Sequence, residues 1–295
     1  MTGPVPVRRG LALPCFAEDP GELVRFGIAA ERAGFDGFFL WDHLVHADTG
    51  QGPPVVDPWQ VLALVAAGTS RIRVGTMITP LPRRRPWKLA KEATTLDLLS
   101  GGRVILGVGL GAPAHGEFRL FGEPSEPRVR AELLDEGLAI LAGLQTGRPF
   151  SYAGKHFTIG PVQFSPRPVQ RPRIPIWVGG HLPGGGPLTR AARWDGYIPI
   201  HRARPDGVAT ADDIAAARDR IAVLRGGAEG FDIAVWGTLD DGTLAARLPG
   251  YAAAGATWWI ESVQTQRPGW QEAVAARVRP AGPAGAGPEV QSPRG

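Results

Sequence analysis

The sequence predicts a single (β/α)8 TIM barrel, a fold class supported by three observations. Apolar runs of strand length alternate with segments of helical period along the chain, and eight such pairs can be counted. Runs such as 104–106 are apolar at every position, which is typical of parallel strands buried on both faces. Strands separated by helices run parallel, and 295 residues suffice for one barrel. A doubly wound open sheet is the alternative architecture.

Each element is placed by its apolar period and by the residues at its ends. Proline at positions 20, 58 and 86 indicates helix starts, because the first turn needs no N–H at that position. Glycine 34 indicates the end of the first helix. We expect strands at 8–13, 35–40, 72–78, 103–108, 174–178, 196–200, 231–236 and 257–260. We expect helices at 20–34, 58–68, 86–99, 129–144, 187–193, 211–224, 243–254 and 269–278.

Two segments depart from this alternation. Residues 110–173, between the fourth and fifth strands, are longer than one helix requires, and such insertions commonly lie over a ligand pocket. Within them, 152–157 and 162–164 are expected to form a hairpin around Gly160-Pro161. Residues 280–295 have too few apolar side chains to form a core and are expected to be a disordered tail. The barrel domain is therefore expected to occupy residues 1–279.

The composition excludes several classes of protein. The single cysteine, Cys15, cannot form an internal disulfide, and no stretch approaches the ~18 apolar residues of a membrane span. The net charge of +4 comes from arginines scattered among carboxylates, which does not indicate a nucleic-acid surface. We expect a cytoplasmic protein that acts on a small molecule, with neither nucleic acid nor membrane as a partner.

Histidines follow three of the predicted strands, at the end of the barrel where active sites lie. His43, His181 and His201 come after the second, fifth and sixth strands. Because imidazole titrates near neutral pH, His43 is the candidate for proton transfer, with Asp42 holding its tautomer or contacting a ligand. Alternatively, Asp42 caps a loop and His43 is structural.

The same segment also suggests a metal site. Asp42, His43, His46 and Asp48 are residue types that bind zinc, although they fall on an expected loop, where the two imidazoles need not converge. A metal-dependent TIM-barrel hydrolase using His43 and His46 is therefore an alternative function.

Glycines and arginines near the strand ends suggest an anionic ligand. Gly107, Gly109 and Gly111 follow the fourth strand, but Pro113 prevents the immediate helix of a dinucleotide fingerprint. They indicate either close approach to a flat ligand or tight packing of the protein itself. Gly179-Gly180, followed by Gly184–Gly186, could bind an anion near a helix start. Arg83–Arg85 precede a helix, where the macrodipole disfavours cations, so either an anionic ligand tail or a solvated loop must accommodate them.

Four stretches resemble the luciferase-like monooxygenase family of flavin- or deazaflavin-dependent oxidoreductases. They are AGFDGFFLWDH at 33–43, RVGTMITP at 73–80, TLDLLSGGRVILGVGLG at 95–111 and PIWVGG at 175–180. Together they span most of residues 8–200.

The resemblance implies FMN or coenzyme F420 at the C-terminal mouth of a barrel, with His43 and Asp42 as catalytic residues. It implies a bulge in the third strand with a cis peptide at Thr76-Met77. The family's sugar-phosphate dehydrogenases carry a glutamate where this sequence has Ala112, so their substrate is not carried over. A homodimer is expected by analogy, and a non-catalytic flavin-binding protein is a further alternative. The expected cofactor-binding residues are Asp42, Thr76, Met77, Thr79, Gly109, Leu110, Gly111, His115, Val178, Gly179, Gly180 and His181.

Overall fold

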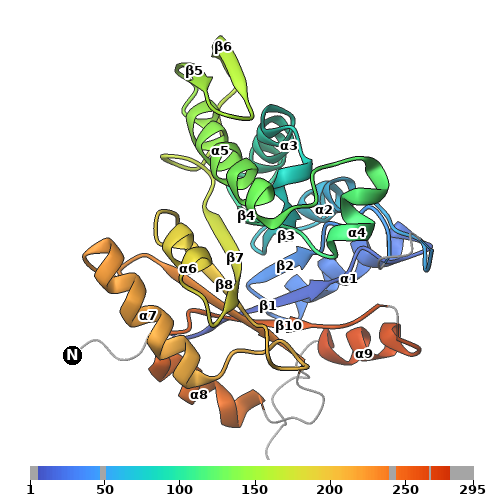
Figure 1. Cartoon of the computed structure of the whole chain (residues 1–295). Helices are drawn as coiled ribbons and strands as arrows, with labels where there is room; N and C mark the ends of the chain where they lie inside the picture. Colours follow the sequence, from blue (N-terminus) through green and yellow to red (C-terminus); the bar gives the residue numbers. More distant parts are fainter. Residues whose placement is uncertain (1–5, 47–50, 239–243, 266, 280–295) are drawn as a thin grey trace, which may run out of the picture.

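The strands of the computed structural model close into one barrel (Figure 1). The structure describes residues 6–46, 51–238, 244–265 and 267–279. In these residues eight parallel strands follow the order β1-β10-β9-β8-β7-β4-β3-β2, and β1 pairs with both β10 and β2. This closure confirms the (β/α)8 barrel and excludes the open sheet. The strands are β1 Arg8–Leu13, β2 Gly37–Leu40, β3 Arg73–Pro80, β4 Val104–Gly109, β7 Ile176–Leu182, β8 Gly196–His201, β9 Asp232–Gly237 and β10 Trp258–Ser262.

Helices connect successive strands around the outside of the barrel (Figure 1). Asp19 caps the first helix and Asp57 the second, each by accepting backbone N–H groups, and Thr210 with Asp213 forms a capping box. The larger helices are α1 Pro20–Arg32, α2 Pro58–Ala67, α3 Pro86–Leu99, α5 Pro127–Gln145, α6 Gly185–Ala191, α7 Ala211–Arg225, α8 Leu244–Ala254 and α9 Trp270–Arg277.

The boundaries differ from the prediction mainly at the C-terminal ends of strands. β3 continues to Pro80, and β7 continues to Leu182 rather than ending at Val178. Gly179, Gly180 and His181 therefore belong to a strand that pairs with β8, because hydrogen bonding to β8 carries the extended backbone past the last apolar residue.

The insertion after β4 contains two short helical turns and a hairpin. The turns are α4 Ala114–Glu117 and a 3-10 turn at Arg119–Phe121, and the hairpin pairs β5 Pro149–Ala153 with β6 Thr158–Gln163. The hairpin projects from the barrel beyond α5 (Figure 1).

The hairpin turn was predicted in the wrong place. It lies at 154–157, and Gly160-Pro161 is inside β6. Glu136 on α5 fixes this turn by accepting the backbone N–H groups of Lys155, His156 and Phe157 at 2.7–3.1 Å. A turn stabilised by a carboxylate from another element leaves no local signal in the sequence.

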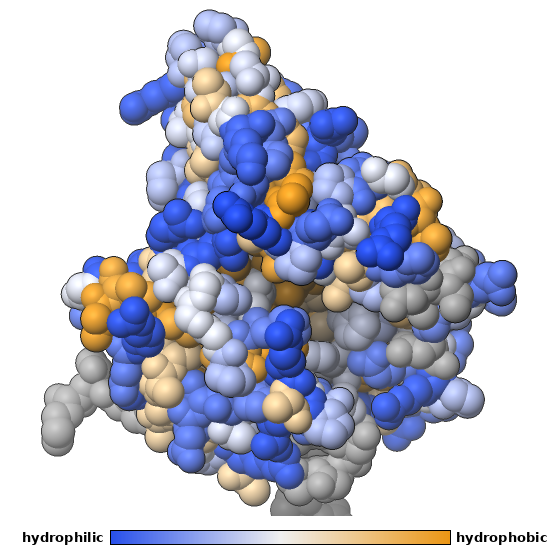
Figure 2. Space-filling model, in the orientation of Figure 1, coloured by the Kyte–Doolittle hydropathy of each residue, from blue (hydrophilic) through white to orange (hydrophobic). Residues whose placement is uncertain are grey.

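The interior of the barrel is filled by large side chains. Phe39, Trp177 and Trp258 are almost fully buried there and contact one another, with ring centroids 5.3–6.0 Å apart. The barrel is therefore a packed core that leaves only its mouth for chemistry. Figure 2 shows a hollow near the middle of the face drawn, with apolar residues at its floor, where Figure 1 places the strands.

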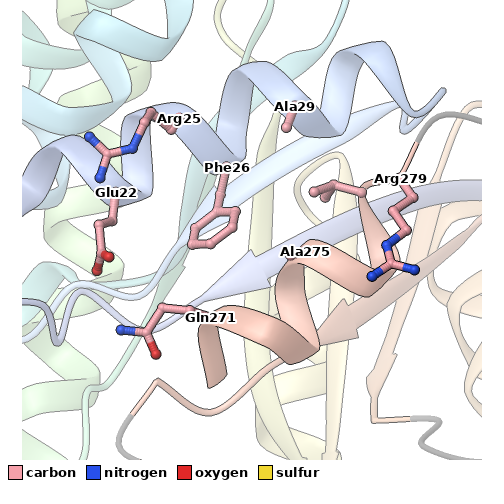
Figure 3. Close-up of a pocket in the computed structure, with 8 residues that line it drawn as sticks. Glu22, Arg25, Phe26, Ala29, Gln271, Ala275 and Arg279 are labelled. Carbon is pink, nitrogen blue, oxygen red and sulfur yellow. The ribbon is translucent and has the colours of Figure 1, made fainter. Parts of the chain in front are cut away.

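A groove of about 400 Å³ lies outside the barrel between α1 and α9. Phe26 points into it, flanked by Glu22 and Arg25 on one helix and Gln271 on the other (Figure 3). The groove is separated from the barrel mouth by the strand wall, so it is not part of the site described below.

No helix within the described residues is long and apolar enough to cross a membrane. The tail predicted at 280–295 lies outside the described residues.

Candidate active site

The loop after β2 contains the pair that the sequence analysis selected. Asp42 and His43 follow β2 directly and so lie at the C-terminal mouth of the barrel. His181 and His201 end parallel strands of the same barrel and lie at this mouth too. The sequence therefore predicted correctly which end of the barrel gathers histidines.

Asp42 is a buried ion-pair partner. Its carboxylate is 1% exposed and accepts hydrogen bonds from Thr79 Oγ1 at 2.8 Å, Arg84 Nη2 at 2.7 Å and Arg83 Nη2 at 3.1 Å. Trp59 Nε1 donates a further bond at 3.4 Å. Asp42 therefore does not orient His43, so the expectation that it holds the tautomer of this histidine was wrong.

Arg83 and Arg84 correct another expectation. We expected them to face either a ligand tail or a solvated loop, but their side chains are only 3% and 17% exposed. They are bound by carboxylates that follow other strands. Burial lowers the pKa of Arg84, but the charge and hydrogen bond of Asp42 together with the charges of nearby carboxylates outweigh burial and raise the pKa above its ordinary value. Of the three arginines, only Arg85 is exposed.

Glu117, which sequence reasoning missed, is the partner of His43. This carboxylate on α4 is fully buried, and its Oε1 lies 3.1 Å from His43 Nδ1. It also accepts the backbone N–H groups of Leu44 at 3.1 Å and Val45 at 3.4 Å. Its Oε2 lies 3.1 Å from Arg83 Nε. The two atoms form an ion pair, but their geometry does not make a hydrogen bond. The insertion thus contacts the loop after β2 through the Glu117 side chain.

The two buried carboxylates of this cluster each have an arginine partner. Arg83 and Arg84 pair with Asp42, Arg83 also pairs with Glu117, and Arg84 lies 3.6 Å from Glu92 as well. Because the buried anions already have cationic partners, His43 is not needed as a permanent countercharge.

Aromatic rings surround His43. The ring centroids of Phe16 and Trp41 lie 5.3 Å and 5.8 Å from the imidazole, and Trp236 contacts Trp41 at 6.4 Å. The His43 side chain remains 19% exposed, and its Nε2 has no hydrogen-bond partner in the part of the chain that the structure describes. One ring nitrogen is thus held inside the protein and the other is left for the mouth.

The third strand carries the predicted bulge. Its register against β4 shifts between Thr76 and Thr79, and the cis peptide joins Met77 to Ile78, one residue later than predicted. The bulge comprises Met77 and Ile78, the two residues inside this register shift, and the cis peptide is the bond between them. The hydroxyl of Thr76 donates to the Gly107 carbonyl and is therefore engaged within the protein.

Packing explains the glycines that follow β4 and end β7. A Cβ at Gly179 would lie 2.1 Å from Ile78 Cδ1, and one at Gly180 would lie 2.1 Å from Pro187 Cβ. A Cβ at Gly109 would lie 3.0 Å from Ile78 Cγ2, and Gly111 has a φ of +80°. These glycines make room for protein side chains or for a turn, so the interpretation that they clear space for a ligand is not supported.

The backbone of β7 is open on one side at the mouth. Pairing of β4 with β7 ends at Val108 and Val178, whereas β7 continues to Leu182. The edge of Gly179 and Gly180 that faces β4 therefore has no strand partner. On the β4 side, Arg130 binds the carbonyls of Leu110 and Gly111, which turns these two groups away from the mouth.

The other predicted histidines lie apart from the cluster. His115 is exposed on α4, two residues before Glu117. Partial burial, followed by the charge of Arg202, lowers the pKa of His181. His201 Nε2 lies 3.8 Å from Asp213.

The donors suggested for a metal site do not converge. His43 binds Glu117, Asp42 binds arginines, and His46 packs edge-on against Phe16 at 5.0 Å. Asp48 lies outside the described residues. Within those residues no group of three or more His, Cys, Asp or Glu side chains is placed to hold a metal ion.

The fold is a parallel (β/α)8 barrel, and a buried charge cluster with a histidine lies at its C-terminal mouth. This arrangement is typical of barrel enzymes, whose active sites lie at that end. Residues 5–239 match the family described as luciferase-like monooxygenase. The chain belongs to this family, which confirms the resemblance noted from the sequence.

Relatives within the family include a curated enzyme and two solved structures. The F420-dependent glucose-6-phosphate dehydrogenase of Microbacterium testaceum is 34% identical over 206 residues, covering 68% of this chain and 59% of that protein. The match thus spans about three fifths of the curated relative. The F420-dependent tetrahydromethanopterin reductase of Methanopyrus kandleri superposes with a TM-score of 0.72 at 19% identity, covering 93% of this chain and 98% of that one. The monooxygenase RslO1 of Streptomyces bottropensis gives 0.71 at 22% identity, covering 92% and 96%. At these identities the two structures show a shared fold.

Proposed function

We propose that this protein is an F420-dependent oxidoreductase that exchanges a hydride with a small organic substrate at the barrel mouth. The observation that carries the proposal is His43 on the loop after β2, which is held at Nδ1 by Glu117 and has no hydrogen-bond partner at Nε2 among the described residues. Support comes from the curated relative, whose named activity depends on F420.

The mouth fits a flat ring with a polar edge. Among the described residues, the edge of β7 beyond Val178 has no strand partner on the β4 side, so backbone groups there need partners, whereas the Gly180 carbonyl already accepts from the Tyr197 hydroxyl. Ile78, which follows the cis peptide, packs on Gly109 and Gly179 and presents an apolar side chain beside that edge. Backbone from the β3 bulge and from Val178–Gly180 would hold such a ring.

When bound, the deazaflavin supplies the hydride acceptor or donor. The chain carries the proton: His43 Nε2 takes a proton from a substrate hydroxyl in oxidation and returns it in reduction. Glu117 keeps the ring in one orientation during both directions, while Phe16 and Trp41 cover it and limit the access of water.

A sugar phosphate is not the proposed substrate. Ala112 stands where the resemblance implies a glutamate in sugar-phosphate dehydrogenases. The rings of Phe16, Trp41 and Trp236 instead surround the proton-transfer group. We propose a small alcohol or carbonyl compound with an apolar or aromatic part.

Fluorescence titration with F420 and, separately, with FMN tests the cofactor. We expect F420 to bind at micromolar concentration and FMN to bind more weakly. Binding of neither at high micromolar concentration would overturn the proposal, and tight binding of FMN alone would redirect it to flavin chemistry.

The reaction is tested by following the absorbance of F420 in the presence of glucose 6-phosphate, of 2-propanol and of benzyl alcohol. We expect reduction with an alcohol that has an apolar part and none with the sugar phosphate. A His43→Gln variant should bind F420 normally and lose turnover, whereas full turnover by this variant would indicate a different proton carrier. The homodimer is part of the proposal, and sedimentation equilibrium tests it.

A further inference from the structure

We infer that Glu117 is the positioning residue of the active site: it fixes His43 in the tautomer with hydrogen on Nδ1 and so keeps Nε2 available at the mouth. This inference deepens the proposed function and rests on it. It assigns the supporting role to an insertion residue 74 positions away, and not to the neighbouring Asp42.

The first argument is the direction of each hydrogen bond. A carboxylate that is ionised only accepts, so His43 Nδ1 must carry the hydrogen in its contact with Glu117 Oε1. The same oxygen also accepts the N–H groups of Leu44 and Val45, so it acts as an acceptor toward all three groups of this loop. Nε2 is then the unprotonated nitrogen of the neutral ring, as proton uptake requires.

The second argument is that Glu117 is held on several sides. It is fully buried, accepts two backbone N–H groups from the loop that carries His43, and pairs with Arg83. Arg83 Nη2 also donates to the Asp42 carbonyl at 2.9 Å, which fixes the residue before His43. The carboxylate therefore sets both the position of the loop and the orientation of the imidazole.

The third argument is that Asp42 has no capacity left for this role. Its two carboxylate oxygens receive Thr79, Arg83 and Arg84, and Trp59 adds a longer bond. The two carboxylates therefore have different roles. Asp42 pairs with both arginines, and Glu117 orients the histidine.

The primary test needs no cofactor. The full chain is labelled with ¹⁵N-histidine, and the shifts of His43 are assigned by their loss in His43→Gln. We expect the wild-type ring to carry its hydrogen on Nδ1. In Glu117→Gln, the amide cannot accept from His43, Leu44 and Val45 while also facing Arg83 as an acceptor, so the hydrogen should shift toward Nε2. A wild-type ring protonated on Nε2 would overturn the inference without any variant.

Turnover gives the second readout, using F420 and the alcohol identified above. Glu117→Gln should lower kcat by roughly 100-fold, the scale of general acid–base assistance, and change KM and F420 affinity less than threefold. Glu117→Asp keeps the charge and should recover part of kcat. If no alcohol is turned over, the proposed function fails while the tautomer measurement still decides the inference.

Glu136→Gln is the matched control. Glu136 also accepts several backbone N–H groups from a loop, but it lies at the hairpin turn and contacts no mouth residue. We expect it to keep the His43 tautomer and kcat. An equal loss of kcat in Glu136→Gln and Glu117→Gln would show that the loss reflects general destabilisation and would contradict the inference.

Discussion

At the residue scale, the buried carboxylate of Asp42 is the counter-ion of two arginines that are shielded from water. Removing one partner of a buried ion pair is costly because the other charge stays buried and unpaired. The pair therefore constrains the site even though the Asp42 side chain is only 1% exposed.

Replacing Asp42 with asparagine should lower the free energy of unfolding by about 3 kcal/mol, because Arg83 and Arg84 would stay buried in a cluster that has lost one of its negative charges. Urea unfolding measures the loss. Asp19→Asn is the control: Asp19 pairs with Arg25 at the surface, and asparagine also caps a helix, so the loss of stability should be much smaller. Equal losses for the two variants would contradict the account.

Cys15 should be unreactive in the folded protein. Burial, more than the nearby charges of Asp42 and Glu117, raises the pKa of its thiol to about 12, so almost no thiolate exists at pH 8. Iodoacetamide followed by mass spectrometry should find Cys15 unmodified in the native state and modified in urea. Rapid native alkylation at pH 8 would show that the thiol is accessible.

The sequence predicted part of this residue-level picture. His43 and the mouth were found because a barrel places strand ends together. Arg83 and Arg84 were recognised as unfavourable before α3, but the expectation of a ligand tail or a solvated loop was wrong, because carboxylates of the protein itself bind them. Glu117 was missed because a carboxylate in an insertion has no spacing that links it to a loop 74 residues earlier.

At the element scale, β3 and β4 approach each other more closely than most strands allow. A Cβ at Gly75 would lie 1.8 Å from the Ile105 carbonyl oxygen, and one at Gly107 would lie 2.3 Å from that of Thr76. These contacts involve backbone, so the strands themselves would have to separate just before the bulge that lines the mouth.

Gly75→Ala should therefore cost roughly 3 kcal/mol of unfolding free energy, at the upper end of overpacking effects. It should also weaken F420 binding through displacement of the bulge. Gly160→Ala in β6 is the control, since a Cβ added there would meet no atom within 4 Å and the stability should be unchanged. Chemical denaturation of both variants compares them. A stable Gly75→Ala protein would contradict the close approach.

The contacts between the hairpin and α5 should make a pH-dependent contribution to the stability of the fold. Lys155 and then His156 lower the pKa of Glu132 from 4.5 to about 2. The pKa is depressed by folding, so the stabilisation is present above pH 4.5 and is lost as the pH falls toward 2. The stability difference between wild type and Glu132→Gln should shrink over that range. A difference that is constant from about pH 6 to about pH 3 would contradict this.

The strands and helices predicted from hydrophobic periodicity alone were correct, as for β1 and α3. The predictions were wrong where a contact from another element decided the geometry. The hairpin turn depends on Glu136, and the extension of β7 depends on pairing with β8. Proline at position 161 suggested a turn but instead occupies a strand of a two-stranded sheet, where one missing donor is tolerated.

At the scale of the whole molecule, cofactor binding should stabilise the fold. A ligand that binds only the native state adds about 2.7 kcal/mol at a concentration of about 100 times Kd. Differential scanning calorimetry should therefore show a higher Tm with F420. His43→Gln should keep this increase, because the proposed contacts to the cofactor come from backbone. An unchanged Tm at saturating F420 would contradict binding to the native barrel.

The position of Glu117 limits how the substrate specificity of this barrel can be altered. Exchanging residues 110–126 for the corresponding segment of another barrel would leave His43 in place but remove the carboxylate that orients it. The insertion after β4 and His43, the proposed proton carrier, therefore cannot be changed independently. A successful graft must bring its own acceptor for His43 Nδ1, the N–H groups of Leu44 and Val45, and the charge of Arg83.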